Sequence, residues 1–252
     1  MNYGEIMFRS GDSVSKRTEF SRINSTNKGV EEKYNEQIES VFYEKVIPTK
    51  LFASNYDITK VVIPENIEII EDSAFTSCHY LDEVVLPNSL KSIGESAFSF
   101  ISNLVEIKLP ETLTTIKASA FKMCKNLKKV EIPEMVTMIE NATFLGCEKL
   151  ESVVLTNVTS IGALAFFGCN SLKEIHLPET LVSIEQMVFA ECNSLEFIKL
   201  PNNIKTLSSG AFQRCENLTA IEYNGKRYTD KKEFNEKIAE DGLITSGREA
   251  WV

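Results

Sequence analysis

The sequence predicts an α/β solenoid, in which short stacked units each contribute one parallel strand and one tight helical or 3₁₀ turn. Apolar residues recur with a period of 23 residues, and a proline starts nearly every period. A fixed period of this length is typical of a solenoid, because one unit cannot bury its apolar side chains alone and must stack on its neighbours. The units begin at Pro64, Pro87, Pro110, Pro133, Thr156, Pro178 and Pro201.

Two apolar columns show how closely the units follow one another. One column is phenylalanine throughout, at Phe75, Phe98, Phe121, Phe144, Phe166, Phe189 and Phe212. The other is isoleucine or leucine, at Ile70, Ile93, Ile116, Ile139, Ile161, Ile184 and Leu207. The unit that starts at Thr156 has 22 residues and keeps both columns, so we interpret its missing residue as a loop deletion.

The repeated motif L-x-x-V/I-x-L-P-x-x-L-x-x-I-x-x-x-A-F-x-x-C resembles the BspA-like class of leucine-rich repeats, and it covers about residues 41–223. The resemblance implies a leucine-rich-repeat solenoid. It also implies a kinship with surface proteins of bacteria and protists, in which the repeat is a scaffold and the binding partners vary.

Each unit is expected to end in a short strand, which forms one rung of a parallel sheet. The run from Leu127 to Ile132 alternates apolar and polar residues, which indicates a strand, and the proline that follows ends it. A second short extended piece should follow the proline. The Ala-Phe-x-x-Cys segment is long enough only for a turn of helix or 3₁₀ helix.

Residues 1–40 are predicted to be an N-terminal segment that ends in a capping helix. Glu5–Arg9 has the pattern of a strand, and residues 31–43 place apolar side chains on one helical face. The repeat domain then spans residues 41–223, and residues 41–63 form a degenerate first unit with Leu51 and Phe52 in the places of Ala74 and Phe75.

Residues 224–252 are predicted to cap the other end. Asn224-Gly225 between strand-like residues is a strong signal for a β-hairpin. Asp230 followed by Glu233 predicts a capping box for a helix over Lys231–Glu240, which Gly242 would end. The last ten residues, including Trp251, are expected to be loose or lightly docked.

The charge of the chain makes nucleic acid an unfavourable partner. The net charge is −9; the first 40 residues contribute −1 and residues 224–252 contribute zero, so the repeats carry −8. Phosphate binding depends on lysine and arginine, which an acidic body lacks in excess. No apolar run is long enough to insert into a membrane.

The amino terminus leaves the compartment open. It lacks the apolar core of a signal peptide, so the expectation is either an intracellular protein or a chain whose leader has been removed. The family resemblance favours the cell surface or secretion, whereas this amino terminus, if native, favours the cytoplasm.

The six cysteines share one place in the repeat and are predicted to be free and buried. They are Cys78, Cys124, Cys147, Cys169, Cys192 and Cys215, and Ile101 fills the same place in the second unit. Side chains in one column point the same way, so neither disulfide pairing nor tetrahedral zinc binding is expected. No cofactor or metal site is predicted.

No group of residues has the pattern of a catalytic site. His79 and His176 lie in different units at different places in the repeat, where solvent-facing side chains are expected. Phosphate-binding loops, HExxH and GxSxG motifs are absent from the sequence. The sequence therefore does not predict an enzyme.

Candidate binding residues lie where the strands should face solvent, on the concave side of the solenoid. Phe197 stands out, because polar residues occupy most equivalent positions and an exposed aromatic side chain on a rigid sheet is a typical anchor for a partner. It should form an apolar spot with Val154, two rungs earlier. The candidate residues are Phe197, Val154, His176, Lys199, Val85 and Val62.

The charged residues of the same face allow two interpretations. They either stabilise the sheet as cross-strand pairs or form part of a recognition surface. The expected neighbours are Glu106 with Lys129, Lys108 with Glu131, and Lys199 with Glu222.

Two functional hypotheses follow. The first is a non-enzymatic, adhesin-like or interaction module that binds a protein, or else a glycan, on its concave strand face. The alternative is an intracellular scaffold or effector whose active surface is the N-terminal segment, with the solenoid as a rigid rod.

Overall fold

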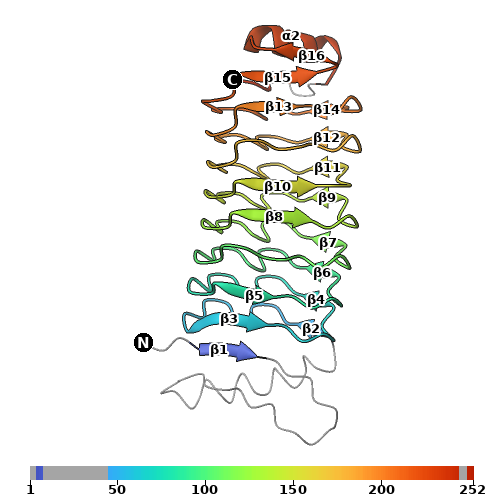
Figure 1. Ribbon diagram of the computed structural model, residues 1–252. Coiled ribbons are helices and arrows are strands. Elements are labelled where there is room, and N and C mark those ends of the chain that lie inside the picture. Colours follow the sequence, from blue (N-terminus) through green and yellow to red (C-terminus); the bar gives the residue numbers. More distant parts are fainter. Residues whose placement is uncertain (1–3, 8–44, 244–248) are drawn as a thin grey trace, which may run out of the picture.

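The computed structural model describes residues 4–7, 45–243 and 249–252, and it is a stack of coils built on the predicted period (Figure 1). Each coil places one short extended segment on each of two sides of the stack, and most of these segments are strands. The two series of strands form separate ladders along the molecule, and the helix α2 covers the C-terminal end (Figure 1). The solenoid prediction is therefore confirmed.

The first ladder carries the strands that the alternating pattern predicted. It contains β3 (Ile58–Val62), β5 (Glu83–Val85), β8 (Lys129–Ile132), β10 (Ser152–Leu155), β13 (Phe197–Lys199) and β15 (Ala220–Tyr223). Neighbours are parallel and one period apart, as in Val153 opposite Val130 and Ile198 opposite Ile221. Single bridges at Glu106 and His176 continue the ladder between the named strands. We call the outer surface of this ladder the strand face.

The second ladder is formed by two-residue strands after each proline. They are β2 (Val46–Ile47), β4 (Ile69–Ile70), β6 (Ser92–Ile93), β7 (Thr115–Ile116), β9 (Met138–Ile139), β11 (Ser160–Ile161), β12 (Ser183–Ile184) and β14 (Thr206–Leu207). The second residue of each strand is buried. The 22-residue unit keeps its register here, with Ile161 opposite Ile139 and Ile184. Its deletion therefore falls in a loop, as predicted.

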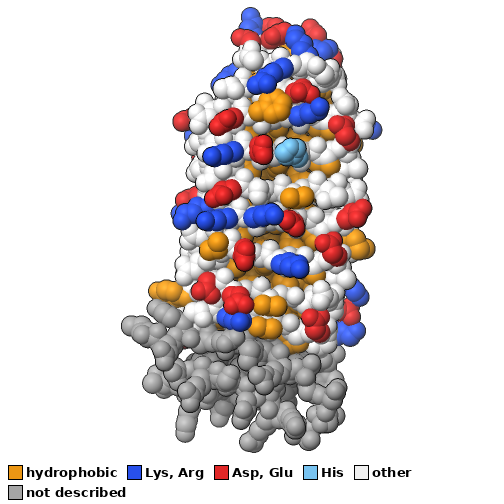
Figure 2. All heavy atoms as spheres, in the orientation of Figure 1, with side chains coloured by type: hydrophobic (Ala, Val, Ile, Leu, Met, Phe, Trp, Pro, Cys, Tyr) orange, Lys and Arg blue, Asp and Glu red, His pale blue; other side chains and the backbone are white. Residues whose placement is uncertain are grey.

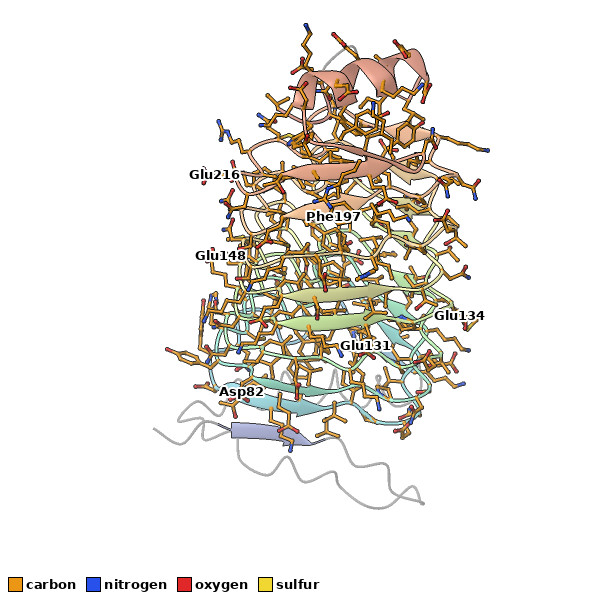
Figure 3. All side chains as sticks on the ribbon, turned by 45° about the horizontal axis from the view of Figure 1, so that its top comes forward. Asp82, Glu131, Glu134, Glu148, Phe197 and Glu216 are labelled. Carbon is orange, nitrogen blue, oxygen red and sulfur yellow. The ribbon has the colours of Figure 1, made fainter. Side chains whose placement is uncertain are left out.

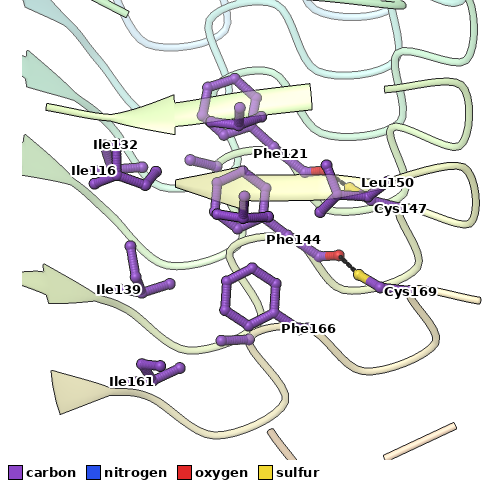
Figure 4. Packing of buried hydrophobic residues seen from close by; sticks show 14 of the residues in the cluster. Ile116, Phe121, Ile132, Ile139, Phe144, Cys147, Leu150, Ile161, Phe166 and Cys169 are labelled. Atoms are coloured by element: carbon purple, nitrogen blue, oxygen red, sulfur yellow. Dashed lines mark hydrogen bonds between the residues drawn. The ribbon is translucent and has the colours of Figure 1, made fainter. Parts of the chain in front are cut away.

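The core between the ladders is a continuous stack of phenylalanine rings (Figure 4). Neighbouring ring centroids lie 5.1–5.8 Å apart and successive planes differ by no more than 13°. Phe52 begins the stack, so the unit before Pro64 packs like the regular ones. The stacking arises because each phenylalanine N–H donates to the carbonyl of the alanine or equivalent residue one unit later, as Phe121 does to Thr143 at 2.9 Å.

The cysteine column is buried, as predicted, and it also makes a hydrogen bond that the sequence did not indicate. Each thiol donates to the carbonyl oxygen of a phenylalanine, with Sγ–O distances of 2.9–3.3 Å (Figure 4). All six cysteines are free. The side chain thus fills the core and also satisfies a carbonyl group at the turn.

The N-terminal end carries one strand from outside the repeats. β1 (Gly4–Met7) pairs in parallel with β3, with Ile6 opposite Val61. The predicted strand at Glu5–Arg9 is therefore present over Glu5–Met7, and residues 8–9 lie outside the described residues. It extends the first ladder beyond the degenerate unit. The predicted capping helix over 31–43 lies outside the described residues.

The C-terminal hairpin and helix form as predicted. Asn224 and Gly225 have φ values of 51° and 73°, which suit the tight turn between β15 and the antiparallel β16 (Lys226–Tyr228). Helix α2 (Lys231–Glu240) begins after Asp230, whose side chain accepts a hydrogen bond from the Glu233 N–H at 2.8 Å.

The two ends of α2 differ in how closely they match the prediction. The reciprocal half of the capping box is absent, because the Glu233 carboxylate pairs with Lys226 of β16 instead. This contact ties the helix to the hairpin. At the other end Gly242, with φ of 71°, stops the helix and donates to the Ala239 carbonyl at 3.1 Å.

The expectation of a loose or lightly docked C-terminal tail is wrong for residues 249–252, and residues 244–248 lie outside the described residues. Trp251 is only 1% exposed, and its ring meets Phe234 of α2 edge-on at 6.1 Å. The Phe212 N–H donates to the Ala250 carbonyl at 2.8 Å, just as the Phe189 N–H donates to Ala211 in the unit before. Ala250-Trp251 therefore occupies the place that Ala-Phe would hold in a further repeat and closes the core.

Candidate binding surface

The strand face presents most of the outward residues of the rungs in the orientation that the alternation predicts, whereas Ala220 of β15 is buried. Val85 and Val154 are 42% and 46% exposed. The residues that precede them in their strands, Val84 and Val153, are buried. Val62 is half-buried and lies opposite Val85 in the ladder. These positions are rigid because their backbones belong to a ladder anchored on the phenylalanine stack.

The structure brings three of the predicted binding residues together: Val154, His176 and Lys199. His176 is bridged to Val154 on one side and to Lys199 on the other, and all three side chains are exposed. The prediction of a solvent-facing histidine is confirmed for His176. His79 differs: it is half-buried because its ring stacks on Tyr56, with centroids 5.6 Å apart.

Phe197 is less exposed than the sequence indicated. It lies on the strand face, but it is half-buried because the guanidinium of Arg227 sits over its ring, 5.1 Å from the centroid. Arg227 belongs to β16, which folds back beside the last rung. The sequence predicted the hairpin but not which of its side chains would reach Phe197.

The charged pairs agree only in part with the expected neighbours. Lys199 and Glu222 form an ion pair at 2.8 Å, as expected. Glu106 and Lys129 are bridged in the ladder, but the Lys129 ammonium instead meets Glu131 of its own strand at 2.6 Å. This hydrogen bond from Lys129 lowers the pKa of Glu131, with a smaller contribution from Lys108. The charges are therefore not a simple set of cross-strand pairs.

The central rungs of the strand face enclose a shallow hollow of about 710 Å³. Its floor includes buried Val84, Ile107 and Ile132, and exposed Val85 and Val154 lie along it. Acidic and basic side chains are interspersed with apolar ones over this side of the molecule (Figure 2). The ionic residues of its lining are Asp82, Glu83, Glu106, Glu111, Glu131 and Glu134, with Lys108 and Lys129.

Glu111 and Glu134 were not predicted to lie on this face, and neither was Asp82. Glu111 and Glu134 each follow the proline at the end of a strand, a position that we assigned to the turn. In the structure both side chains are exposed and border the hollow. Asp82 and Glu134 lie toward opposite edges of the face, with Glu131 between them (Figure 3). The signal in the sequence was the recurrence of glutamate directly after the proline, at Glu65, Glu111, Glu134 and Glu179.

Chemistry by the cysteines is disfavoured by their surroundings. Burial raises the pKa of Cys78, Cys124 and Cys215 to about 12 and raises the pKa of the other three thiols well above the ordinary value. The thiolate is the reactive form, so these side chains are poor nucleophiles and poor metal ligands. Within residues 4–7, 45–243 and 249–252, no three His, Cys, Asp or Glu side chains are grouped as metal ligands would be.

In the described part of the chain, no helix is both long and apolar enough to cross a bilayer.

Comparisons with known proteins agree with this architecture. The T. pallidum leucine-rich repeat protein TpLRR is similar in structure, with a TM-score of 0.56 and 30% sequence identity over 60% of this chain and 71% of that one. A leucine-rich repeat protein from Eubacterium ventriosum has a TM-score of 0.52 and 20% identity, over 68% of this chain and 63% of its own, and supports the fold alone.

The comparison of sequences gives a second, independent result. A search of curated proteins finds no match. The family description "BspA type Leucine rich repeat region" matches residues 45–170 and 137–237, which together cover most of the chain. Since the matched segments are the stacked coils themselves, this chain belongs to the BspA-type leucine-rich repeat family.

Proposed function

We propose that this chain is a non-enzymatic protein-interaction module that receives its partner on the strand face. The hollow over the central rungs carries the proposal, because it is a recessed surface of outward side chains held on a rigid ladder. Extended sheet faces of solenoids are common binding surfaces. A partner that also reached the C-terminal rungs would meet Val154, His176 and Lys199, with Phe197 and Arg227 beyond them.

The apolar and polar parts of the strand face have the arrangement of a protein interface. Buried Val84, Ile107 and Ile132 form an apolar floor, exposed Val85 and Val154 lie at its two ends, and charged residues border it. A protein interface typically has an apolar core and a polar rim. The half-buried Phe197 is a less accessible anchor than Val154, so we expect it to contribute at the edge.

Selective blocking of the strand face tests this proposal. The six native thiols are buried, so a cysteine introduced by Val154→Cys can be modified alone with a bulky maleimide. The matched control is Met138→Cys, because Met138 is 53% exposed and lies in the second ladder. Proteins and peptides selected from a displayed library on the unmodified chain are then measured against both adducts.

The adduct at Val154 is expected to abolish binding of most selected ligands, and the adduct at Met138 is expected to leave it unchanged. Ligands that tolerate the Val154 adduct would argue against the strand face. If those ligands are lost when residues 1–28 are deleted, the N-terminal segment is the binding surface and the alternative hypothesis replaces this one.

A further inference from the structure

We propose that the occupant of the strand-face hollow is an extended, lysine- or arginine-rich segment of a protein partner. This inference rests on the proposed function and specifies the chemistry of the ligand. Four features of the hollow carry it: its length, its apolar floor, its excess of carboxylates, and the lack of partners for several of them.

The length of the hollow suits a short extended peptide. Its lining runs from β5, through the rung of Glu106 and β8, to Val154 of β10. Three rung spacings amount to about 14 Å along the stack. An extended chain rises about 3.3 Å per residue, so roughly four to five residues would lie in the hollow. Val85 and Val154 at its two ends offer apolar contacts to alternate side chains.

The charge of the lining is acidic. Six carboxylates and two lysine ammonium groups line the hollow. Glu131 is already paired with Lys129, and Glu83 with Lys60 outside the hollow. Among the described residues, the carboxylates of Asp82, Glu106, Glu111 and Glu134 make no hydrogen bond or ion pair. They are exposed to water in this structure.

These free carboxylates decide between classes of partner. A neutral or apolar surface pressed onto the hollow would remove water from them without supplying a hydrogen-bond donor, which is unfavourable. An acidic peptide or the phosphates of a nucleic acid would be repelled. A basic segment supplies ammonium or guanidinium donors to the carboxylates while its stems and backbone cover the valines. A protein segment with alternating basic residues therefore fits best.

The test uses the full chain and two synthetic peptides of about ten residues, enough to cross the hollow. Lysine alternates with valine in one peptide, and glutamate alternates with valine in the other. Binding is followed by the fluorescence anisotropy of a dye at the end of each peptide. We expect the lysine peptide to bind the unmodified chain and the chain that carries a bulky maleimide at Met138→Cys, but not the chain that carries it at Val154→Cys. The glutamate peptide should bind none of the three. Raising the ionic strength should weaken the binding, because both partners are exposed charges.

Matched charge variants locate the binding. Glu111→Gln with Glu134→Gln neutralises two carboxylates of the hollow. Glu196→Gln with Glu216→Gln neutralises two exposed carboxylates outside it that also lack side-chain partners among the described residues. The first pair should weaken binding of the lysine peptide roughly three- to tenfold, because each exposed ion pair contributes modestly. The second pair should change it less than twofold, as expected from a distant screened charge.

Three outcomes would overturn the inference. Equal weakening by both pairs of variants would mean that the peptide follows the net charge of the molecule and not the hollow. Tighter binding of the glutamate peptide would show the opposite preference. A lysine peptide that fails to bind at low ionic strength would exclude a basic occupant. None of these outcomes affects the proposed function, which fails only if selected ligands ignore the Val154 adduct.

Discussion

Phe121 shows at the scale of single residues how the stack is stabilised. Its ring is fully buried and lies parallel to Phe98 and Phe144, with both centroid distances at 5.6 Å. Phe121→Ala should lower the free energy of unfolding by about 3–5 kcal/mol, because it opens a cavity in a column that cannot collapse locally. Denaturant unfolding monitored by circular dichroism measures this change.

Phe197→Ala is the control for that measurement. Phe197 is half-buried and its main ring contact is the Arg227 guanidinium, an interaction of about 0.5–1 kcal/mol at exposed sites. The loss of stability should therefore be clearly smaller than at Phe121. Equal losses would mean that the two sides of the strand have been assigned wrongly.

The cysteine thiols provide a second test at this scale. Their pKa values are raised by burial, to about 12 for Cys124. A thiol-specific reagent at mild alkaline pH should therefore modify none of them in the folded chain and all six after unfolding in denaturant without reductant. Fewer than six reactive thiols in the unfolded chain would indicate disulfides and would contradict the buried column.

Glu68 gives the chain a specific dependence on acid. Hydrogen bonds from Lys45 and Lys91, at 2.6 and 2.5 Å, hold its pKa at about 2 instead of 4.5. A pKa that is lower in the folded state stabilises the fold above the unfolded value, so this contribution is lost as the pH falls from about 4.5 toward 2. Glu68→Gln should make the free energy of unfolding depend less steeply on pH in that window. The same pH dependence in the variant and the parent chain would show that Glu68 does not pair with Lys45 and Lys91 in solution.

At the scale of an element, Asn235 joins helix α2 to the C-terminal tail. It is buried in α2, and its amide accepts from the N–H groups of Ala250 and Trp251 and donates to the Trp251 carbonyl, at 2.9–3.2 Å. Asn235→Ala leaves these backbone groups without partners and should cost about 1–3 kcal/mol of stability. It should also release the tail, which raised hydrogen exchange at Ala250 and Trp251 would report.

Asn217→Ala is the matched control for the tail. Its amide donates to the Asn193 carbonyl at 2.8 Å on an exposed loop, where water can replace it. The change should be within about 0.5 kcal/mol, the usual range for a surface substitution. A similar loss of stability in both variants would show that the buried hydrogen bonds of Asn235 stabilise the fold no more than an exposed one does.

The elements also differ in how well the sequence predicts them. The strands, the hairpin and α2 depend on local patterns, so their places were predictable from alternation, from Asn224-Gly225 and from Asp230. Trp251 was misjudged because its place depends on two contacts with distant parts of the sequence. One is the hydrogen bond from the Phe212 N–H to the Ala250 carbonyl, and the other is the edge-on contact of the Trp251 ring with Phe234. Its dipeptide with Ala250 was a usable signal, since Ala-Phe occupies the same place in most repeats.

The backbone of the turns could not be predicted. Ser119, Ala142, Leu164 and Met187 share one place in the repeat, and all have positive φ values between 54° and 60°. These residues normally avoid that conformation, which glycine adopts freely. The stack imposes the conformation because it closes each coil onto the next. The sequence indicates it only at Gly210, which fills the same place in the last unit with a φ of 66°.

At the scale of the whole molecule, the period predicted the fold and most of the strand face, but not the hollow. Val85, Val154, His176 and Lys199 face solvent as their alternation indicated. The hollow also needs Glu111 and Glu134, which follow the strands and reach the face only after the chain has turned. A surface assembled from neighbouring coils depends on side-chain directions that a repeat pattern does not specify.

Carboxylate footprinting of the chain with a bound protein or peptide tests the central claim, that the strand face receives the partner. A water-soluble carbodiimide and an amine modify exposed carboxylates, and mass spectrometry locates them. Binding should protect Asp82, Glu111 and Glu134 while leaving Glu216 as reactive as in the free chain. Unchanged reactivity of the hollow carboxylates in a saturated complex would contradict the account.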